Sequence, residues 1–167
     1  GMPAAGLPGS PAAAPPVAPG VVTGQPGAAP AVAPAALNPA GERKDYDAAL
    51  EILKEGRYSE ASGAFQAFLK QYPGSSLAGN AQYWLGEVFY VTREFQRALG
   101  EFDKVLKDYP GSTKAPDARL KIGYIRYELK DWAGARDMLS TVVRNHPGTT
   151  TARLAQERLD RMQREGH

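Results

Sequence analysis

The sequence predicts an all-α protein whose helices stack as a repeat array, a solenoid. Across residues 42–167, Ala, Leu, Glu, Lys and Arg dominate, and alternating β-branched segments are scarce. Apolar residues there recur at helical spacing rather than strand spacing. A four-residue phrase also recurs every 37 residues in the same region, at Tyr72–Ser75, Tyr109–Ser112 and His146–Thr149. Self-similarity at a period of this length is typical of stacked supersecondary units.

The first 41 residues differ from the rest in composition. They contain no charged residue, but they hold ten of the fourteen prolines, seven glycines and thirteen alanines. Pro removes backbone donors, and Ala and Gly supply little apolar area to bury. We therefore expect residues 1–41 to be a disordered linker with polyproline II character, followed by one folded domain at residues 42–167.

Each repeat unit is expected to hold two antiparallel helices. In the middle unit the apolar spacing predicts a first helix at about 80–93 and a second at about 95–108. A bulky residue where the two helices cross would push them apart. Small residues recur at these crossings: Gly86, Gly123, Ala61, Ala98 and Ala135.

The turns between units carry stop and start signals. Pro-Gly ends each second helix, and Ser or Thr residues at 75–76, 112–113 and 149–151 are candidates to cap the next one. Pro116 suits the first turn of its helix, where a missing N–H costs nothing. Residues 150–165 form a single capping helix, so we expect three helix pairs plus a C-terminal capping helix.

These positions together resemble the tetratricopeptide repeat. The matching residues of the middle unit are Gly86 and Ala98 at the crossing, Phe102 on the second helix and Pro110 in the turn. The resemblance covers Asp45 to about Gln163 and implies a tetratricopeptide-repeat solenoid. The 37-residue period is roughly three residues longer than usual, which implies a longer turn between units.

Residues 64–90, 102–124 and 147–162 are similar to the C-terminal repeat domain of the Tol-Pal-associated cell division coordinators, a periplasmic family. The resemblance implies a non-catalytic periplasmic scaffold that coordinates outer-membrane constriction with septal peptidoglycan synthesis during cell division. TolA and a class A penicillin-binding protein are the implied partners. Family members oligomerise through an N-terminal coiled coil, which this sequence does not include.

Composition argues against most enzyme classes, metal sites and nucleic-acid binding. The 20 basic and 18 acidic residues nearly cancel, so no strongly basic surface is expected. There is no cysteine, and of the two histidines His146 takes the place of Tyr72 and Tyr109 in the turn. We expect no cofactor and no metal site. No apolar run approaches the ~20 residues that a membrane span needs.

Two carboxylate pairs, Asp131 with Asp137 and Glu157 with Asp160, are candidates for acid–base chemistry. Both lie among Lys and Arg on faces expected to be exposed, where solvated charge is the simpler interpretation. The same interpretation applies to a set of four arginines near the C-terminus: Arg153, Arg158, Arg161 and Arg164. We therefore predict a protein without catalytic residues.

In this repeat class the first helix of each unit lines a concave groove. Aromatic side chains there offer large contact area at low entropy cost. Tyr83 and Tyr124 are favoured as partner contacts, whereas Tyr90 and Tyr127 could instead pack between neighbouring helices. The expected partner-binding groove consists of Tyr46, Tyr83, Glu87, Tyr90, Leu120, Tyr124 and Tyr127, with Leu50 and Leu53 in equivalent places of the first unit.

Three functions remain open at this point. The first is a scaffold that binds a segment of an envelope protein. The second is a regulator that acts directly on a peptidoglycan synthase and uses the linker as a tether. The third is an assembly factor for outer-membrane β-barrel proteins, in which similar repeats occur. Those factors are lipoproteins, so the lack of cysteine in this sequence argues against the third.

Overall fold

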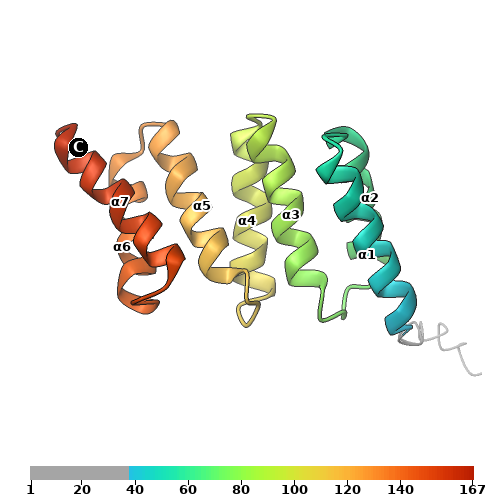
Figure 1. Ribbon diagram of the computed structural model, residues 1–167. Coiled ribbons are helices and arrows are strands. Elements are labelled where there is room, and N and C mark those ends of the chain that lie inside the picture. The colour runs from blue at the N-terminus through green and yellow to red at the C-terminus, as the bar shows by residue number, and fades with distance from the viewer. Residues whose placement is uncertain (1–37) are drawn as a thin grey trace, which may run out of the picture. The chain divides into compact units, whose positions relative to one another are not determined.

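The computed structural model describes residues 38–167. Helices are the only regular secondary structure in this range, and they lie side by side in chain order (Figure 1). This confirms the all-α repeat solenoid with three helix pairs and a C-terminal capping helix. The helices are α1 (Pro39–Lys54), α2 (Tyr58–Gln71), α3 (Ala78–Val91), α4 (Phe95–Asp108), α5 (Ala115–Glu128), α6 (Trp132–Asn145) and α7 (Thr150–Arg164).

The expected linker at residues 1–41 lies almost wholly outside the described residues. Its last residues belong to α1, which begins at Pro39, three residues before the domain boundary that composition indicates. The Asn38 side chain accepts a hydrogen bond from the Gly41 N–H at 3.0 Å. An Asn cap followed directly by Pro is a strong helix start, so the helix extends into the uncharged segment.

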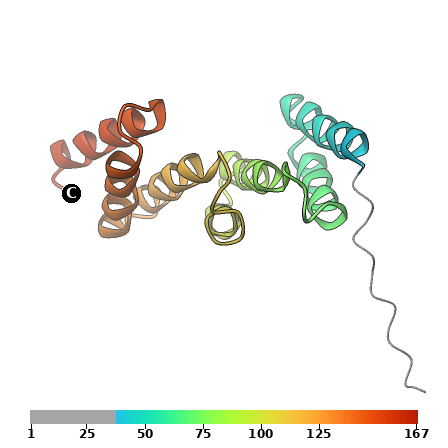
Figure 2. The ribbon, with the colours of Figure 1, turned by 90° about the horizontal axis from the view of Figure 1, so that it is seen from below.

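The odd-numbered helices line one side of the domain. Helices α1, α3 and α5 each pair with the even-numbered helix that follows, and α7 packs on α6. In addition α3 contacts α5, and α5 contacts α7, whereas α2, α4 and α6 make no comparable contacts with one another within residues 38–167. Figure 2 shows the two layers, with α1, α3, α5 and α7 together along one side. The odd-numbered helices therefore form the inner layer.

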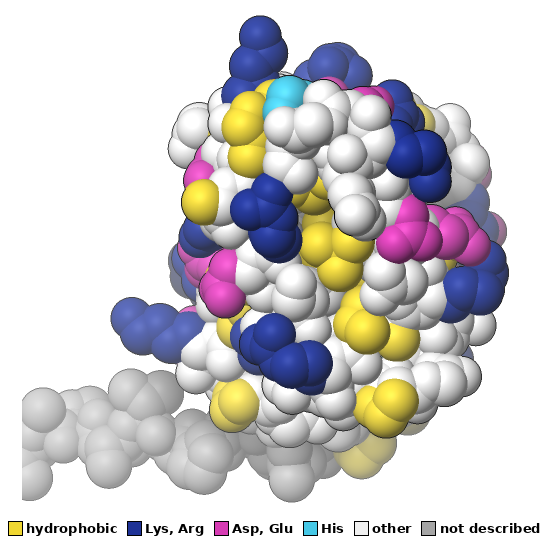
Figure 3. All heavy atoms as spheres, turned by 90° about the vertical axis from the view of Figure 1, so that its left-hand side faces the viewer, with side chains coloured by type: hydrophobic (Ala, Val, Ile, Leu, Met, Phe, Trp, Pro, Cys, Tyr) yellow, Lys and Arg dark blue, Asp and Glu magenta, His cyan; other side chains and the backbone are white. Residues whose placement is uncertain are grey.

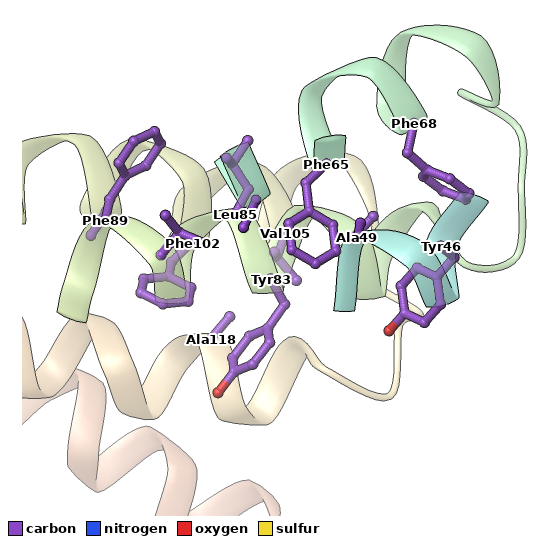
Figure 4. Packing of buried hydrophobic residues seen from close by; sticks show 14 of the residues in the cluster. Tyr46, Ala49, Phe65, Phe68, Tyr83, Leu85, Phe89, Phe102, Val105 and Ala118 are labelled. Carbon is purple, nitrogen blue, oxygen red and sulfur yellow. The ribbon is translucent and has the colours of Figure 1, made fainter. Parts of the chain in front are cut away.

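The small residues lie at the helix crossings, as the repeat predicts. A Cβ atom added to Gly86 would come within 2.6 Å of the Phe102 ring, and one added to Gly123 within 2.7 Å of the Leu139 side chain. Ala98, between them in the chain, is fully buried. Figure 4 shows the aromatic part of this core, including Phe65, Phe102 and their neighbours from successive helices.

The turns between units differ in part from the sequence-based prediction. Thr149 caps α7 as expected, since its Oγ1 accepts from the Ala152 N–H at 3.1 Å. Ser75 and Ser112 do not cap α3 and α5. Their hydroxyls accept from the N–H of the residue two positions on, Leu77 and Lys114, each at 3.1 Å. This extra turn separates the serines from the helices, which start without a side-chain cap.

No helix within residues 38–167 combines the length and apolar character that crossing a bilayer requires.

Candidate partner-binding face

The residues expected to line the groove differ in burial. Tyr46 and Tyr83 are each only 6% exposed, and Leu120 is 4% exposed. The Tyr83 ring packs on Phe102, with centroids 5.5 Å apart, and lies beside Ala118 of α5 (Figure 4). The expectation that Tyr83 projects freely toward a partner is therefore not met, because its ring fills the space between neighbouring helices. The remaining predicted residues are partly exposed: Glu87, Tyr90, Tyr124 and Tyr127.

The junction between α1 and α3 is closed by two aromatic side chains. Trp84 Nε1 donates a hydrogen bond to the Tyr46 hydroxyl at 2.9 Å. Burial raises the pKa of Tyr46, and it raises that of Tyr83 still more. The Lys114 ammonium lies 5.0 Å from the Tyr83 ring centroid and 5.3 Å from that of Trp84. This end of the layer is therefore packed rather than open.

The junction between α3 and α5 joins an ion pair to an aromatic ring. Lys121 Nζ donates to Glu87 Oε2 at 3.0 Å and lies 4.6 Å from the Tyr90 ring centroid. The other carboxylate oxygen, Glu87 Oε1, is buried and accepts no hydrogen bond from the described residues. Burial raises the pKa of Tyr90. Lys121 thus fixes both a carboxylate and a tyrosine of the preceding odd-numbered helix.

The junction between α5 and α7 holds an arginine against two tyrosines. The Arg158 guanidinium carbon lies 4.3 Å from the Tyr124 ring centroid and 4.6 Å from that of Tyr127. The Tyr124 hydroxyl donates to the Leu154 carbonyl at 3.4 Å. The Tyr127 hydroxyl donates to Glu165, whose carboxylate also accepts from Arg161. These two donors hold the pKa of Glu165 below its usual range.

The same position of the repeat supplies a contact at each of the three junctions. Trp84, Lys121 and Arg158 are spaced 37 residues apart, and each reaches back to a tyrosine of the preceding odd-numbered helix. Sequence reasoning placed Arg158 on a solvated surface and gave no role to Trp84 or Lys121. The register of the repeat is the signal that could have found them, because all three align when the units are superposed. Cationic side chains bind the faces of tyrosine rings.

We define the odd-helix face as the partly exposed residues of the last two junctions. Its aromatic and cationic side chains can contact a protein, but they do not form a nucleophile with a base. It consists of Glu87, Tyr90, Lys121, Tyr124, Tyr127 and Arg158.

Three of the four carboxylates considered for acid–base chemistry have structural partners, and the fourth, Asp137, is exposed on α6. Asp131 caps α6 by accepting from the Gly134 N–H at 3.0 Å. Glu157 pairs with Arg153, and Asp160 accepts from Gln156 at 2.7 Å. Among residues 38–167 no group of three or more His, Cys, Asp or Glu side chains is placed to hold a metal ion.

Two family models, both described as tetratricopeptide repeat, match residues 46–113 and 117–149. Together with the helix pairs and their glycine and alanine crossings, they show that the chain belongs to the tetratricopeptide-repeat proteins. Among these, its repeat domain is like that of the cell division coordinator CpoB. The Pseudomonas putida (strain KT2440) CpoB is 57% identical over 51 residues, which are 30% of this chain and 19% of that protein.

The CpoB of Escherichia coli (strain K12) is 39% identical over 57 residues, 34% of this chain and 22% of that protein. The matched segments thus span about a fifth of these relatives. A tetratricopeptide repeat protein from Parabacteroides merdae, known from a crystal structure, is similar with a TM-score of 0.39 and 13% identity. That match covers 74% of this chain and 60% of the other. These names describe repeat proteins and a cell division coordinator, and none is the name of an enzyme.

Proposed function

We propose that this chain is a non-catalytic scaffold of the Tol-Pal system in the periplasm. In this role it coordinates outer-membrane constriction with septal peptidoglycan synthesis during cell division. The likeness to proteins named cell division coordinator supports the process. The odd-helix face supports the molecular activity, which is binding a segment of another protein. TolA and a class A penicillin-binding protein are the proposed partners.

The observation that carries this proposal is that the tyrosines of the odd-helix face are partly exposed and held in place by cations. Tyr90, Tyr124 and Tyr127 are partly exposed, and each ring lies under a cation from the next odd-numbered helix. Tyrosine and arginine are among the residues on which binding energy most often concentrates. Because these side chains are already held in place, a partner would immobilise few rotamers on binding.

The buried residues predicted for the groove have a supporting role in this proposal. Tyr83 and Leu120 are buried residues of α3 and α5, which carry most of the face, and Tyr46 is a buried residue of α1. Replacing Tyr83 would therefore disturb the core as well as the face. A test of binding has to use the exposed tyrosines instead.

The test is calorimetric titration of a purified TolA fragment into the double variant Tyr90→Ala, Tyr124→Ala. Truncating two anchors should weaken binding at least about thirtyfold, since one anchor typically contributes 2 kcal/mol or more. Leu129→Ala is the matched control, because Leu129 is 42% exposed but lies outside the face. Circular dichroism verifies that both variants stay helical. Wild-type affinity in the folded double variant would place the binding surface elsewhere.

A parallel titration with a class A penicillin-binding protein separates the two proposed partners. If both partners use the odd-helix face, the double variant should lose both affinities. If only one affinity falls, that partner is the one bound by the tyrosines.

A further inference from the structure

Four cationic side chains lie over tyrosine rings of the inner layer, and they differ in whether they also pair with a carboxylate. Three of them are paired: Lys114 with Asp117 at 3.6 Å, Lys121 with Glu87 at 3.0 Å, and Arg161 with Glu165 at 2.8 Å. Arg158 is the exception. Within residues 38–167 no hydrogen bond or ion pair joins its guanidinium to an acceptor, although it is partly buried and lies over two rings.

Arg158 is held in position without a carboxylate. Its guanidinium lies against Tyr124 and Tyr127, and the hydroxyls of these rings are themselves tied to the Leu154 carbonyl and to Glu165. These ring contacts use none of the N–H donors of the guanidinium in a hydrogen bond within residues 38–167. Arg158 therefore presents a positively charged group that has no carboxylate partner within residues 38–167.

The neighbouring acidic groups do not pair with Arg158. Glu157, next to Arg158 in the chain, pairs with Arg153, and Glu165 is engaged by Arg161 and Tyr127. Figure 3 looks onto the end of the domain that carries α7, where Lys and Arg side chains, with Asp and Glu side chains among them, surround hydrophobic surface. The unpaired guanidinium favours a negatively charged group on the ligand.

We propose that Arg158 is the anion-binding position of the odd-helix face and receives the carboxylate of an Asp or Glu side chain from the bound protein segment. This inference rests on the proposed function, because it names the chemistry of the partner at that face. The guanidinium would donate two parallel N–H···O hydrogen bonds to the carboxylate oxygens. Tyr124 and Tyr127 are positioning residues for this contact, since they orient the arginine.

The direct test uses a simple acidic probe and NMR. The full chain is titrated with an acetylated, amidated hexaglutamate peptide and, separately, with the matching hexaglutamine peptide. The Arg158 Nε–H resonance and the ring resonances of Tyr124 and Tyr127 should shift saturably with hexaglutamate only. Added salt should reduce the effect.

Two variants decide whether the response belongs to Arg158. Arg158→Gln should abolish the shifts of the two tyrosine rings. Arg164→Gln, which removes the same charge from α7 at an exposed residue, should leave them unchanged. A ring response that persists in Arg158→Gln would overturn the proposal. So would an equal loss in both variants, because general attraction to a basic helix would then explain it. The dispersion of the amide spectrum reports whether each variant is folded.

A titration with the TolA fragment separates this inference from the proposed function. Arg158→Gln should weaken TolA binding about tenfold or more, and Arg158→Lys should restore only part of the loss. Equal affinity of wild type and Arg158→Gln would overturn the role of Arg158 while leaving the scaffold proposal in place. Hexaglutamate binding at Arg158 without TolA binding would support the anion site and reject TolA as the partner.

Discussion

Gly123 and Leu139 show how one absent side chain sets the distance between two helices. The Leu139 side chain of α6 occupies the space that a Cβ atom at position 123 of α5 would need, at 2.7 Å. Gly86 and Phe102 repeat this contact one unit earlier, at 2.6 Å. Glycine is therefore needed at these positions because it lets the two helices approach closely, and its backbone freedom plays no part.

We predict that Gly123→Leu destabilises the domain by about 1–3 kcal/mol, because the crossing cannot accept the extra volume. Chemical denaturation followed by circular dichroism measures the change. Gly100→Leu is the control, since nothing lies within 4 Å of a Cβ atom at that exposed site of α4. It should be neutral or stabilising by up to about 1 kcal/mol, because leucine is the better helix former. Equal effects of the two variants would contradict this account of the crossing.

At the scale of the element, helix ends decide how well the sequence predicts the fold. The predicted bounds of the second helix, 95–108, agree with α4, because a turn precedes it and Tyr-Pro-Gly follows it. By contrast α3 begins at Ala78, two residues before the predicted start, and ends at Val91. A helix that starts after Leu77 with no side-chain cap leaves no signal in the sequence.

The N-terminus of α6 gives a test at this scale. Asp131 accepts from the Gly134 N–H, whereas Asp137 lies exposed within the helix. We predict that Asp131→Ala costs about 1 kcal/mol of stability, while Asp131→Asn retains most of it because Asn is an equally good cap. Asp137→Ala should change stability by less than about 0.5 kcal/mol. Thermal melts of the three variants measure the differences, and a similar loss for both alanine variants would argue against the cap.

At the scale of the whole domain, the sequence predicts the array but not the burial of each groove residue. Tyr83 and Leu120 occupy equivalent positions and are both buried, whereas Tyr124 is partly exposed. Burial there depends on how closely successive odd-numbered helices approach, and repeat spacing alone does not determine this. For the same reason Arg158 could not be assigned from the sequence: its contacts with Tyr124 and Tyr127 arise only when α7 packs beside α5.

The buried and partly buried tyrosines of the inner layer make the whole domain sensitive to alkaline pH. Burial raises the pKa of Tyr46, Tyr83, Tyr90 and Tyr124 above the value of about 10 in an unfolded chain. The unfolded state therefore loses these protons first, so the stability is full below pH 10 and falls as the pH rises above it.

We predict that the Tm decreases steadily between about pH 10 and pH 11.5. Tyr83→Phe lacks one of the buried phenols, so its Tm should decrease less steeply over the same range. Thermal melts monitored by circular dichroism at several pH values provide both slopes. Parallel curves for wild type and Tyr83→Phe would show that Tyr83 does not contribute to the alkaline loss.

The short reach of the contacts between helices has a kinetic consequence. Each junction joins helices that are adjacent or next but one in the chain. The side-chain hydrogen bonds between helices span at most 38 residues within the described part of the chain, as in Trp84 with Tyr46. Chains with such local contacts close only short loops and fold in microseconds to milliseconds. During synthesis, each helix pair can therefore assemble on the one before it while the rest of the domain is still being translated.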